Sequence, residues 1–312
     1  MQLIFFQKLK YYFNRATPSI KILGISHFIL GISVRFCKYV HLNCIANFLE
    51  KKHTGNILNY IHVNIAPHIK LAEPNIHDIQ ELPIIWICWL QGIESAPKLI
   101  TSTINSILSN SLGYQVRLID SNNLNDYLTL PTHIVNKCKS KDAGRIQHFT
   151  DLIRFGLIAK YGGIWMDANI LVTKPIDTQF GELDFYSCHP RNVGKWHVGL
   201  IGGRNSILFQ TVFEMMIYYW EKHDCLIDYF LTDRLIQYCY INYPVITSVI
   251  NSCPNNNPDI QWFISHRDTK FDKDMFSKIL SRNYCFKLTT KVKMGEKTGT
   301  YSEHLIAKYI DS

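Results

Sequence analysis

The stretch from Gly144 to Leu171 constrains the fold more than any other part of this 312-residue chain. It reads GRIQHFTDLIRFGLIAKYGGIWMDANIL. A largely apolar run of helical length ends at Tyr161-Gly162-Gly163, and glycine permits the left-handed backbone with which many helices end. Ile164-Trp165-Met166 then reads as a short buried strand that ends in Asp167. A helix, a glycine hinge and a buried strand in this order indicate an α/β fold with a carboxylate at a strand end.

Polar side chains stand out in this apolar stretch. Asp151 and Arg154 are three residues apart and therefore share one face of the helix, and Gln147 lies one turn earlier on the same face. Asp167 and Asn169 follow the strand. This combination indicates a site for a metal-bound diphosphate. The alternative is a structural Asp/Arg ion pair beside an ordinary turn.

These residues resemble the DXD sugar-transferase group, and most closely the capsular polysaccharide synthesis glycosyltransferases of bacteria. That group carries S/T-D-x-x-R and then Y-G-G-[IV]-W/Y-x-D-x-[DNTS]. This chain has TDLIR at residues 150–154 and YGGIWMDAN at residues 161–169. The resemblance covers about residues 83–310. It implies an α/β fold of the GT-A type with a mixed central sheet, like that of nucleotide-diphospho-sugar transferases. The sequence predicts a helical N-terminal segment before this domain.

The resemblance also implies roles for the residues of the motif. Asp151 would accept hydrogen bonds from sugar hydroxyls, and Arg154 would contact sugar and phosphate oxygens as a fork of donors. Asp167 and Asn169 would hold Mn²⁺ or Mg²⁺ against the diphosphate. Asn169 replaces the second acid of the usual motif, so we expect weaker metal binding and leave metal dependence open. His304 is a further candidate ligand.

Other residues are assigned to the donor by the same resemblance. Trp89 corresponds to the aromatic residue that stacks on uracil, and Gln91 and Gly92 follow it in the chain. Gly163, of the glycine pair of the motif, and Gln147 are also assigned to the donor. Asp120 ends the second predicted strand, where a ribose contact and an Asx turn are both plausible interpretations. Trp86 is expected in the core.

A second acidic element follows later in the chain. Asp228 begins DYFLTD, which resembles a stretch of the same family and would face the donor sugar or the acceptor. An acid at a helix N-terminus is the alternative interpretation. The segment HVGLIGG at residues 197–203 is expected to shape the acceptor side.

The remaining sequence predicts a large α/β domain at residues 81–312 and a helical segment at residues 1–80. From Pro83 onward, strands and helices alternate, which predicts a parallel βαβ unit with functional groups at the carboxyl ends of its strands. We expect Ser95 to cap the first helix. The predicted elements are strands at 84–90, 114–120, 164–170, 183–188, 198–202 and 284–288, and helices after Pro97 and at 144–160, 206–222, 228–240 and 302–310.

Composition narrows the class of protein. The formal charge of +8 suits an anionic substrate or an anionic membrane surface, and no nucleic-acid module is visible. The nine cysteines include no C-x-x-C pair, so they indicate buried thiols in a reducing compartment and neither a disulfide framework nor a zinc site. We expect no membrane span, because the best candidate, residues 20–34, is too short. Basic and aromatic residues in the first 40 suit either docking on an anionic bilayer or packing on the catalytic domain.

The sequence therefore predicts a bacterial glycosyltransferase. It would move a hexose from a nucleotide sugar, expected to be UDP-linked, to a surface polysaccharide or a lipid-linked glycan, with retention and metal assistance. We expect it in the cytoplasm, with peripheral attachment to the inner face of the cytoplasmic membrane as one reading of the N-terminal segment. The alternatives are a sugar-nucleotide-binding protein without transferase activity and a membrane-surface interaction protein.

Overall fold

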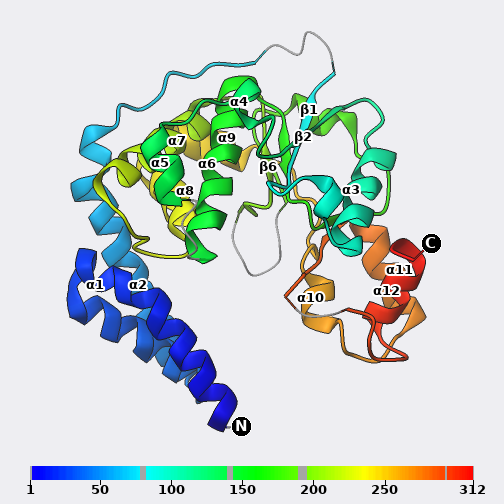
Figure 1. Cartoon of the computed structure of the whole chain (residues 1–312), viewed down its shortest axis with the longest axis horizontal. Coiled ribbons are helices and arrows are strands. Elements are labelled where there is room, and N and C mark those ends of the chain that lie inside the picture. Colours follow the sequence, from blue (N-terminus) through cyan, green and yellow to red (C-terminus); the bar gives the residue numbers. More distant parts are fainter. Residues whose placement is uncertain (1, 78–81, 139–142, 189–194, 292–293, 312) are drawn as a thin grey trace. The chain divides into compact units, whose positions relative to one another are not determined.

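The structure is a computed structural model that describes residues 2–77, 82–138, 143–188, 195–291 and 294–311, with the side chains of residues 2–18 and 143–145 left undescribed. Figure 1 shows N-terminal helices followed by alternating strands and helices. The chain divides into two compact units, each built from three segments. Unit 1 comprises Met1–Glu73, Leu130–Gly156 and Ile207–Ile246; unit 2 comprises Pro74–Thr129, Leu157–Ser206 and Thr247–Ser312.

The described part of unit 1 is built on helices whose apolar faces are buried. Phe149 and Phe155 on one helix and Phe209 on another are fully buried, and the rings of Phe155 and Phe209 lie 5.7 Å apart. The elements are α1 (Gln2–Tyr39), α2 (Asn43–Asn64), η1 (Ala66–His68), α5 (Thr132–Cys138), most of α6 (Ala143–Tyr161), α7 (Ile207–Lys222), α8 (Leu231–Asn242) and the start of α9 (Pro244–Asn251).

Unit 2 contains a mixed five-stranded sheet with the strand order β2-β1-β3-β6-β5. β1 pairs in parallel with β2 and with β3, whereas β6 runs antiparallel to β3 and β5. The sheet strands are β1 (Ile84–Cys88), β2 (Gln115–Ile119), β3 (Ile164–Met166), β5 (Tyr186–Ser187) and β6 (Leu200–Gly202). This architecture confirms the predicted α/β class, the mixed sheet and the parallel βαβ unit.

Helices and a second, two-stranded sheet complete unit 2. In that sheet β4 pairs antiparallel with β7. The elements are η2 (Ile93–Ser95), α3 (Lys98–Asn110), α4 (Leu124–Tyr127), the end of α6, β4 (Ile170–Val172), η3 (Thr178–Glu182), most of α9, α10 (Trp262–His266), α11 (Lys273–Arg282), β7 (Cys285–Lys287) and α12 (Tyr301–Tyr309).

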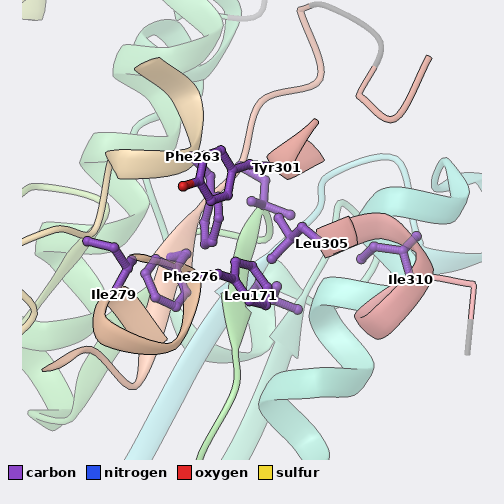
Figure 2. Close-up of a cluster of buried hydrophobic side chains, with 9 residues drawn as sticks. Leu171, Phe263, Phe276, Ile279, Tyr301, Leu305 and Ile310 are labelled. Carbon is purple, nitrogen blue, oxygen red and sulfur yellow. The ribbon is translucent and has the colours of Figure 1, made fainter. Parts of the chain in front are cut away.

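An apolar cluster fixes the second sheet within unit 2 (Figure 2). Leu171 of β4 faces its register partner Phe286 of β7, and both are fully buried. Phe263 contacts Phe286 edge to face at 4.8 Å. The cluster comprises Leu171, Phe263, Phe276, Ile279, Phe286, Leu288, Tyr301, Leu305 and Ile310. The cluster holds β7 against β4, the strand that follows β3 in the chain.

Two predictions about local structure were wrong. Ser95 does not cap α3, because its hydroxyl donates to the carbonyls of Gln91 and Gly92 and Pro97 holds the N-cap position. The strand predicted at 164–170 is interrupted by a turn that Asp167 begins, and its second half joins β7 in a separate sheet. The expectation of no membrane span stays a prediction, although Ser19–Tyr39 is long and apolar enough to cross a membrane by length and composition.

The candidate span is weak evidence of insertion, because only its length and composition qualify it. The sequence window stopped at residue 34, but the helix continues to Tyr39. Gly24 lies within the segment and has a non-helical backbone (φ 78°, ψ 172°), so two helices meet at a kink there.

Candidate functional site

The carboxyl ends of three neighbouring parallel strands carry three of the predicted site residues. Trp89 follows β1, Asp120 follows β2 and Asp167 follows β3. The Trp89 amide donates to the Ile119 carbonyl at 2.9 Å, which joins the ends of the first two strands. Open α/β sheets bind ligands at this edge, because the loops that leave parallel strands gather there. The structure thus brings these residues to one edge of unit 2.

Asp167 is held by contacts to both of its carboxylate oxygens. Trp165 Nε1 donates to Oδ1 at 2.8 Å, and Lys287 Nζ forms an ion pair with Oδ2. The Asp167 amide donates to the Gly199 carbonyl, and its carbonyl accepts from the Ile170 amide, both at 2.9 Å. The carboxylate is about one-fifth exposed. Its position is therefore fixed while it stays accessible to a ligand.

Lys287 reaches Asp167 because of its place in β7. Side chains alternate between the two faces of a strand, and the neighbours Phe286 and Leu288 both lie in the apolar cluster of Figure 2. The Lys287 ammonium is therefore directed away from that cluster and onto the carboxylate. A cation beside Asp167 is a feature that the motif alone did not predict.

Glycines give this carboxylate and its strand the room they need. A Cβ at Gly199 would lie 2.5 Å from Asp167 Oδ2 and 2.8 Å from Lys287 Nζ, closer than real contacts allow. At Gly163 (φ +91°), a Cβ would lie 2.5 Å from the Ile84 carbonyl oxygen of β1. Gly163 is buried and lets β3 pack beside β1, and its predicted contact with the donor stays a prediction.

Asn169 uses its amide nitrogen within the protein. Nδ2 donates to the Leu288 carbonyl at 2.6 Å, and the Leu288 amide donates back to the Asn169 carbonyl at 2.9 Å. This pair of hydrogen bonds ties the turn after β3 to the end of β7. Only Oδ1 is then left to act as a ligand.

The binding of a divalent ion at Asp167 and Asn169 stays a prediction. Among the residues that the structure describes, no group of three or more His, Cys, Asp or Glu side chains could hold a metal. The Asp167 carboxylate and Asn169 Oδ1 are hard oxygen ligands at one turn, and Mg²⁺ or Mn²⁺ commonly completes such a pair with phosphate and water oxygens. His304 is exposed on α12, and its ring stacks on Phe271 at 3.5 Å. Its role as a ligand stays a prediction.

The residues after β1 form a turn. Trp89 is half-buried, and its Nε1 atom is buried without a hydrogen-bond acceptor among the described residues. By contrast, Trp86 is fully buried and donates to the Gly162 carbonyl at 2.9 Å, which confirms its place in the core. Gln91 is exposed, and Gly92 has a positive φ of 81° where the chain turns. The stacking of a base on the Trp89 ring stays a prediction.

Asp120 forms the Asx turn that was one of its two interpretations. Its Oδ1 accepts from the amides of Asn122 at 2.7 Å and Asn123 at 3.1 Å. Asn123 Oδ1 accepts in return from the Asp120 amide at 3.0 Å. The carboxylate therefore shapes the loop, and a contact with ribose stays a prediction.

Unit 1 contains the other predicted polar cluster. Arg154 Nη1 donates to Asp151 Oδ1 at 2.6 Å, as the helical spacing predicted. Thr232 Oγ1, from α8, donates to Asp151 Oδ2 at 2.7 Å. The Arg154 side chain is almost fully buried, whereas the Asp151 side chain is about one-fifth exposed. Both oxygens of Asp151 are thus held by the protein, and sequence reasoning missed Thr232, whose only signal is its place inside DYFLTD.

Asp228 and Gln147 are the other predicted site residues of unit 1. Asp228 lies just before α8, and its carboxylate pairs with Arg234 Nε at 3.4 Å. This matches the interpretation of an acid near a helix N-terminus. Gln147 is exposed one turn before Asp151. The donor or acceptor contacts predicted for the two residues stay predictions.

Beside Gln147, a buried histidine joins two helices of unit 1. Trp220 Nε1 donates to His148 Nδ1 at 2.7 Å. Burial lowers the pKa of His148 from its ordinary value of 6.5 to about 4, and the nearby Asp151 offsets this only in part. The imidazole is therefore neutral near pH 7 and serves the packing of α6 against α7.

The comparison with protein families agrees with the resemblance in the motif. The family described as capsular polysaccharide synthesis protein matches residues 32–305, which is most of the chain. The match begins well before residue 83, so α2 and the end of α1 lie inside the family region, contrary to the sequence-based estimate. No curated protein matches the chain. Because the family match spans nearly its whole length, the chain belongs to the family of capsular polysaccharide synthesis proteins.

Proposed function

We propose that this protein is a GT-A-type glycosyltransferase that moves a hexose from a nucleotide sugar, expected to be UDP-linked, to a surface polysaccharide or a lipid-linked glycan. Family membership supports a place in capsular polysaccharide synthesis. One observation carries the proposal further. Asp167 ends β3 in contact with Trp165 and Lys287, on the same sheet edge as Trp89. That edge is where α/β folds bind nucleotides.

The proposed reaction exchanges one bond for another. The acceptor oxygen bonds to the anomeric carbon while the bond from that carbon to the diphosphate oxygen breaks, and the hydroxyl proton passes to the departing diphosphate. In the retaining course that the resemblance implies, attack and departure share one face of the sugar. No protein nucleophile is then needed, and the protein contributes orientation and charge stabilisation.

Residues of unit 2 supply chemistry suited to the donor. The Trp89 indole offers a flat face for the base, and stacking of this kind contributes about 1–3 kcal/mol. Lys287 offers an ammonium to the diphosphate oxygens, beside the carboxylate that orients it. Asp167 and Asn169 Oδ1 would hold Mn²⁺ or Mg²⁺, which when bound would neutralise charge on the leaving diphosphate. The sugar contacts of Asp151 and Arg154, the role of Asp228 and the cytoplasmic location stay predictions.

Calorimetric titration with UDP, with and without Mn²⁺, tests the donor site. We expect wild-type protein to bind UDP, and Trp89→Leu and Asp167→Asn to bind at least about tenfold more weakly, since each removes a contact worth more than about 1.4 kcal/mol. Asp274→Asn is the matched control, because Asp274 is exposed on α11. Equal affinity in all four proteins would place the nucleotide elsewhere.

A sugar-nucleotide-binding protein without turnover is the second candidate. Asn169 favours it, because the motif lacks a second charged metal ligand and the amide nitrogen is engaged with Leu288. Binding of UDP together with no sugar transfer from any nucleotide sugar to a capsular acceptor would support this alternative over the transferase.

A further inference from the structure

The turn between α1 and α2 gathers large apolar side chains on the surface of unit 1. The two helices lie side by side as a hairpin (Figure 1). Phe28 and Val34 of α1 and Ile57 and Ile61 of α2 are buried. Six large apolar side chains within residues 36–48 are between 39% and 68% exposed: Phe36, Tyr39, Val40, Leu42, Ile45 and Phe48. Ile25, Ile29 and Val63 are exposed elsewhere on the same two helices. A group of exposed large apolar side chains on one turn is typical of an interaction site, and we call these six residues the hairpin tip.

The charge of the chain is concentrated in the same segment. Residues 1–72 hold nine Lys or Arg residues and one acid, Glu50, whereas residues 73–312 hold 24 basic and 24 acidic residues. The whole formal charge of +8 therefore resides in the N-terminal segment. Lys51 and Lys52 are exposed shortly after the tip. Lys38 lies between two tip residues in the chain, and its Nζ atom pairs with Glu50 at 2.8 Å.

Apolar side chains beside basic ones match the interface of an anionic bilayer. Large apolar groups enter the boundary between headgroups and acyl chains, and lysines interact with anionic headgroups. A spanning helix fits less well. After the break at Gly24, α1 continues from Ile25 to Tyr39. That length is about 22 Å at ~1.5 Å per residue, short of a hydrocarbon core of about 30 Å.

We propose that the hairpin tip docks this protein on an anionic membrane surface, with its apolar side chains in the interface and Lys51 and Lys52 on the headgroups. The inference rests on the hairpin alone and not on the proposed transferase activity. It relocates the docking residues that the sequence suggested, from the aromatic residues of the first 40 to the turn at residues 36–48. The side chains of residues 2–18 lie outside the described residues.

Co-sedimentation of the full chain with vesicles tests this proposal. The vesicles contain phosphatidylglycerol and phosphatidylcholine, or phosphatidylcholine alone. We expect wild-type protein to sediment with the anionic vesicles and to be released by alkaline carbonate. The double variant Phe36→Ser/Phe48→Ser should bind at least about tenfold more weakly, since two large apolar groups leave the bilayer. Lys51→Gln and Lys52→Gln should each weaken binding by roughly fivefold at low salt and less at high salt.

Leu112→Ser is the matched control. Leu112 is 90% exposed in unit 2, so its substitution removes an exposed apolar side chain without touching the tip, and we expect wild-type binding. Circular dichroism checks that each variant is folded. Wild-type protein that stays in the supernatant, or a folded double variant that binds as well as wild type, would overturn the proposal. Resistance to carbonate would overturn docking in favour of a spanning helix. Self-association lost in the double variant, without vesicle binding, would assign the tip to a second copy of the chain.

Discussion

At the scale of single residues, Lys287 places a positive charge beside Asp167. Lys287→Met removes that charge and keeps much of the apolar stem. We expect UDP affinity to fall about tenfold and to depend more strongly on Mn²⁺, because the ion would then be the main cation near the diphosphate. Calorimetric titration across a range of Mn²⁺ concentrations measures both effects. Lys278→Met, at an exposed position on α11, is the control. Unchanged affinity and metal dependence would remove Lys287 from the donor site.

The contacts of Asn169 change the expected effect of substituting it. The sequence suggested that Asn169→Asp would restore a charged metal ligand and keep or raise activity. In the structure, Nδ2 donates to the Leu288 carbonyl, and a carboxylate would face that carbonyl without a proton to donate. We now expect the substitution to lower the free energy of unfolding by about 1–3 kcal/mol. Urea unfolding at pH 7.5 measures it. Wild-type stability with tighter Mn²⁺ binding would favour the original interpretation.

The Asp151 cluster makes a prediction that depends on geometry. Arg154→Lys keeps the charge, but a lysine cannot reproduce the planar fork of donors. If Arg154 contacts the donor, turnover should fall about 100-fold or more. Thr232→Val serves as a comparison, because it removes only the hydroxyl that donates to Asp151 Oδ2. Loss of stability in both variants with unchanged turnover per folded molecule would make the cluster purely structural.

At the scale of secondary-structure elements, the sequence predicted the elements whose signals lie close together in the chain. The helix, the glycine pair and β3 follow one another along the chain, and periodicity with two glycines is enough to place them. The register of β7 on β4 could not be predicted, because Lys287 pairs with Ile170 only after a long intervening segment folds. For the same reason Lys287 and Thr232 were not assigned to Asp167 and Asp151. Asn169 shows a further limit, since its motif position did not indicate that its amide ties two elements together.

Helix α6 also makes unit 1 sensitive to acid. The pKa of His148 is about 4 in the folded state and 6.5 ordinarily, so the unfolded chain takes up a proton first as the pH falls. Stability is therefore complete above about pH 6.5 and declines down to about pH 4, by up to about 3 kcal/mol for this group. His148→Gln keeps an acceptor for Trp220 and does not titrate. We expect a smaller loss of stability between pH 7.5 and 5.0 in urea unfolding. His27 contributes to the remaining loss of stability with the same sign, because burial also lowers the pKa of His27 to about 4.

A wild-type loss between these two pH values that His148→Gln leaves unchanged would contradict this assignment. His148→Ala gives a further comparison, because it removes the acceptor for Trp220 Nε1 and leaves a buried donor unsatisfied. It should be less stable than His148→Gln at both pH values by about 1–3 kcal/mol.

At the scale of the whole molecule, composition and family region point to two tasks within one chain. The family match from residue 32 includes α2 and most of unit 2. The N-terminal segment carries the whole net charge, and the sheet of unit 2 carries the residues assigned to the donor. The sequence predicted a boundary near residue 80, and that boundary stays a prediction. Family membership supports a place in capsular polysaccharide synthesis, and an assay of sugar transfer tests the proposed chemistry directly.

That assay is the release of nucleoside diphosphate from a panel of nucleotide sugars, with a membrane fraction from a capsule-producing bacterium as the source of acceptor. Wild-type protein and Asp274→Asn should release it with at least one member of the panel and label the acceptor with the matching sugar. Asp167→Asn should be folded by circular dichroism and at least about 100-fold slower, because it removes the charge at the end of β3. A folded Asp167→Asn variant with wild-type turnover, or wild-type protein that transfers no sugar from any donor, would contradict the proposed activity.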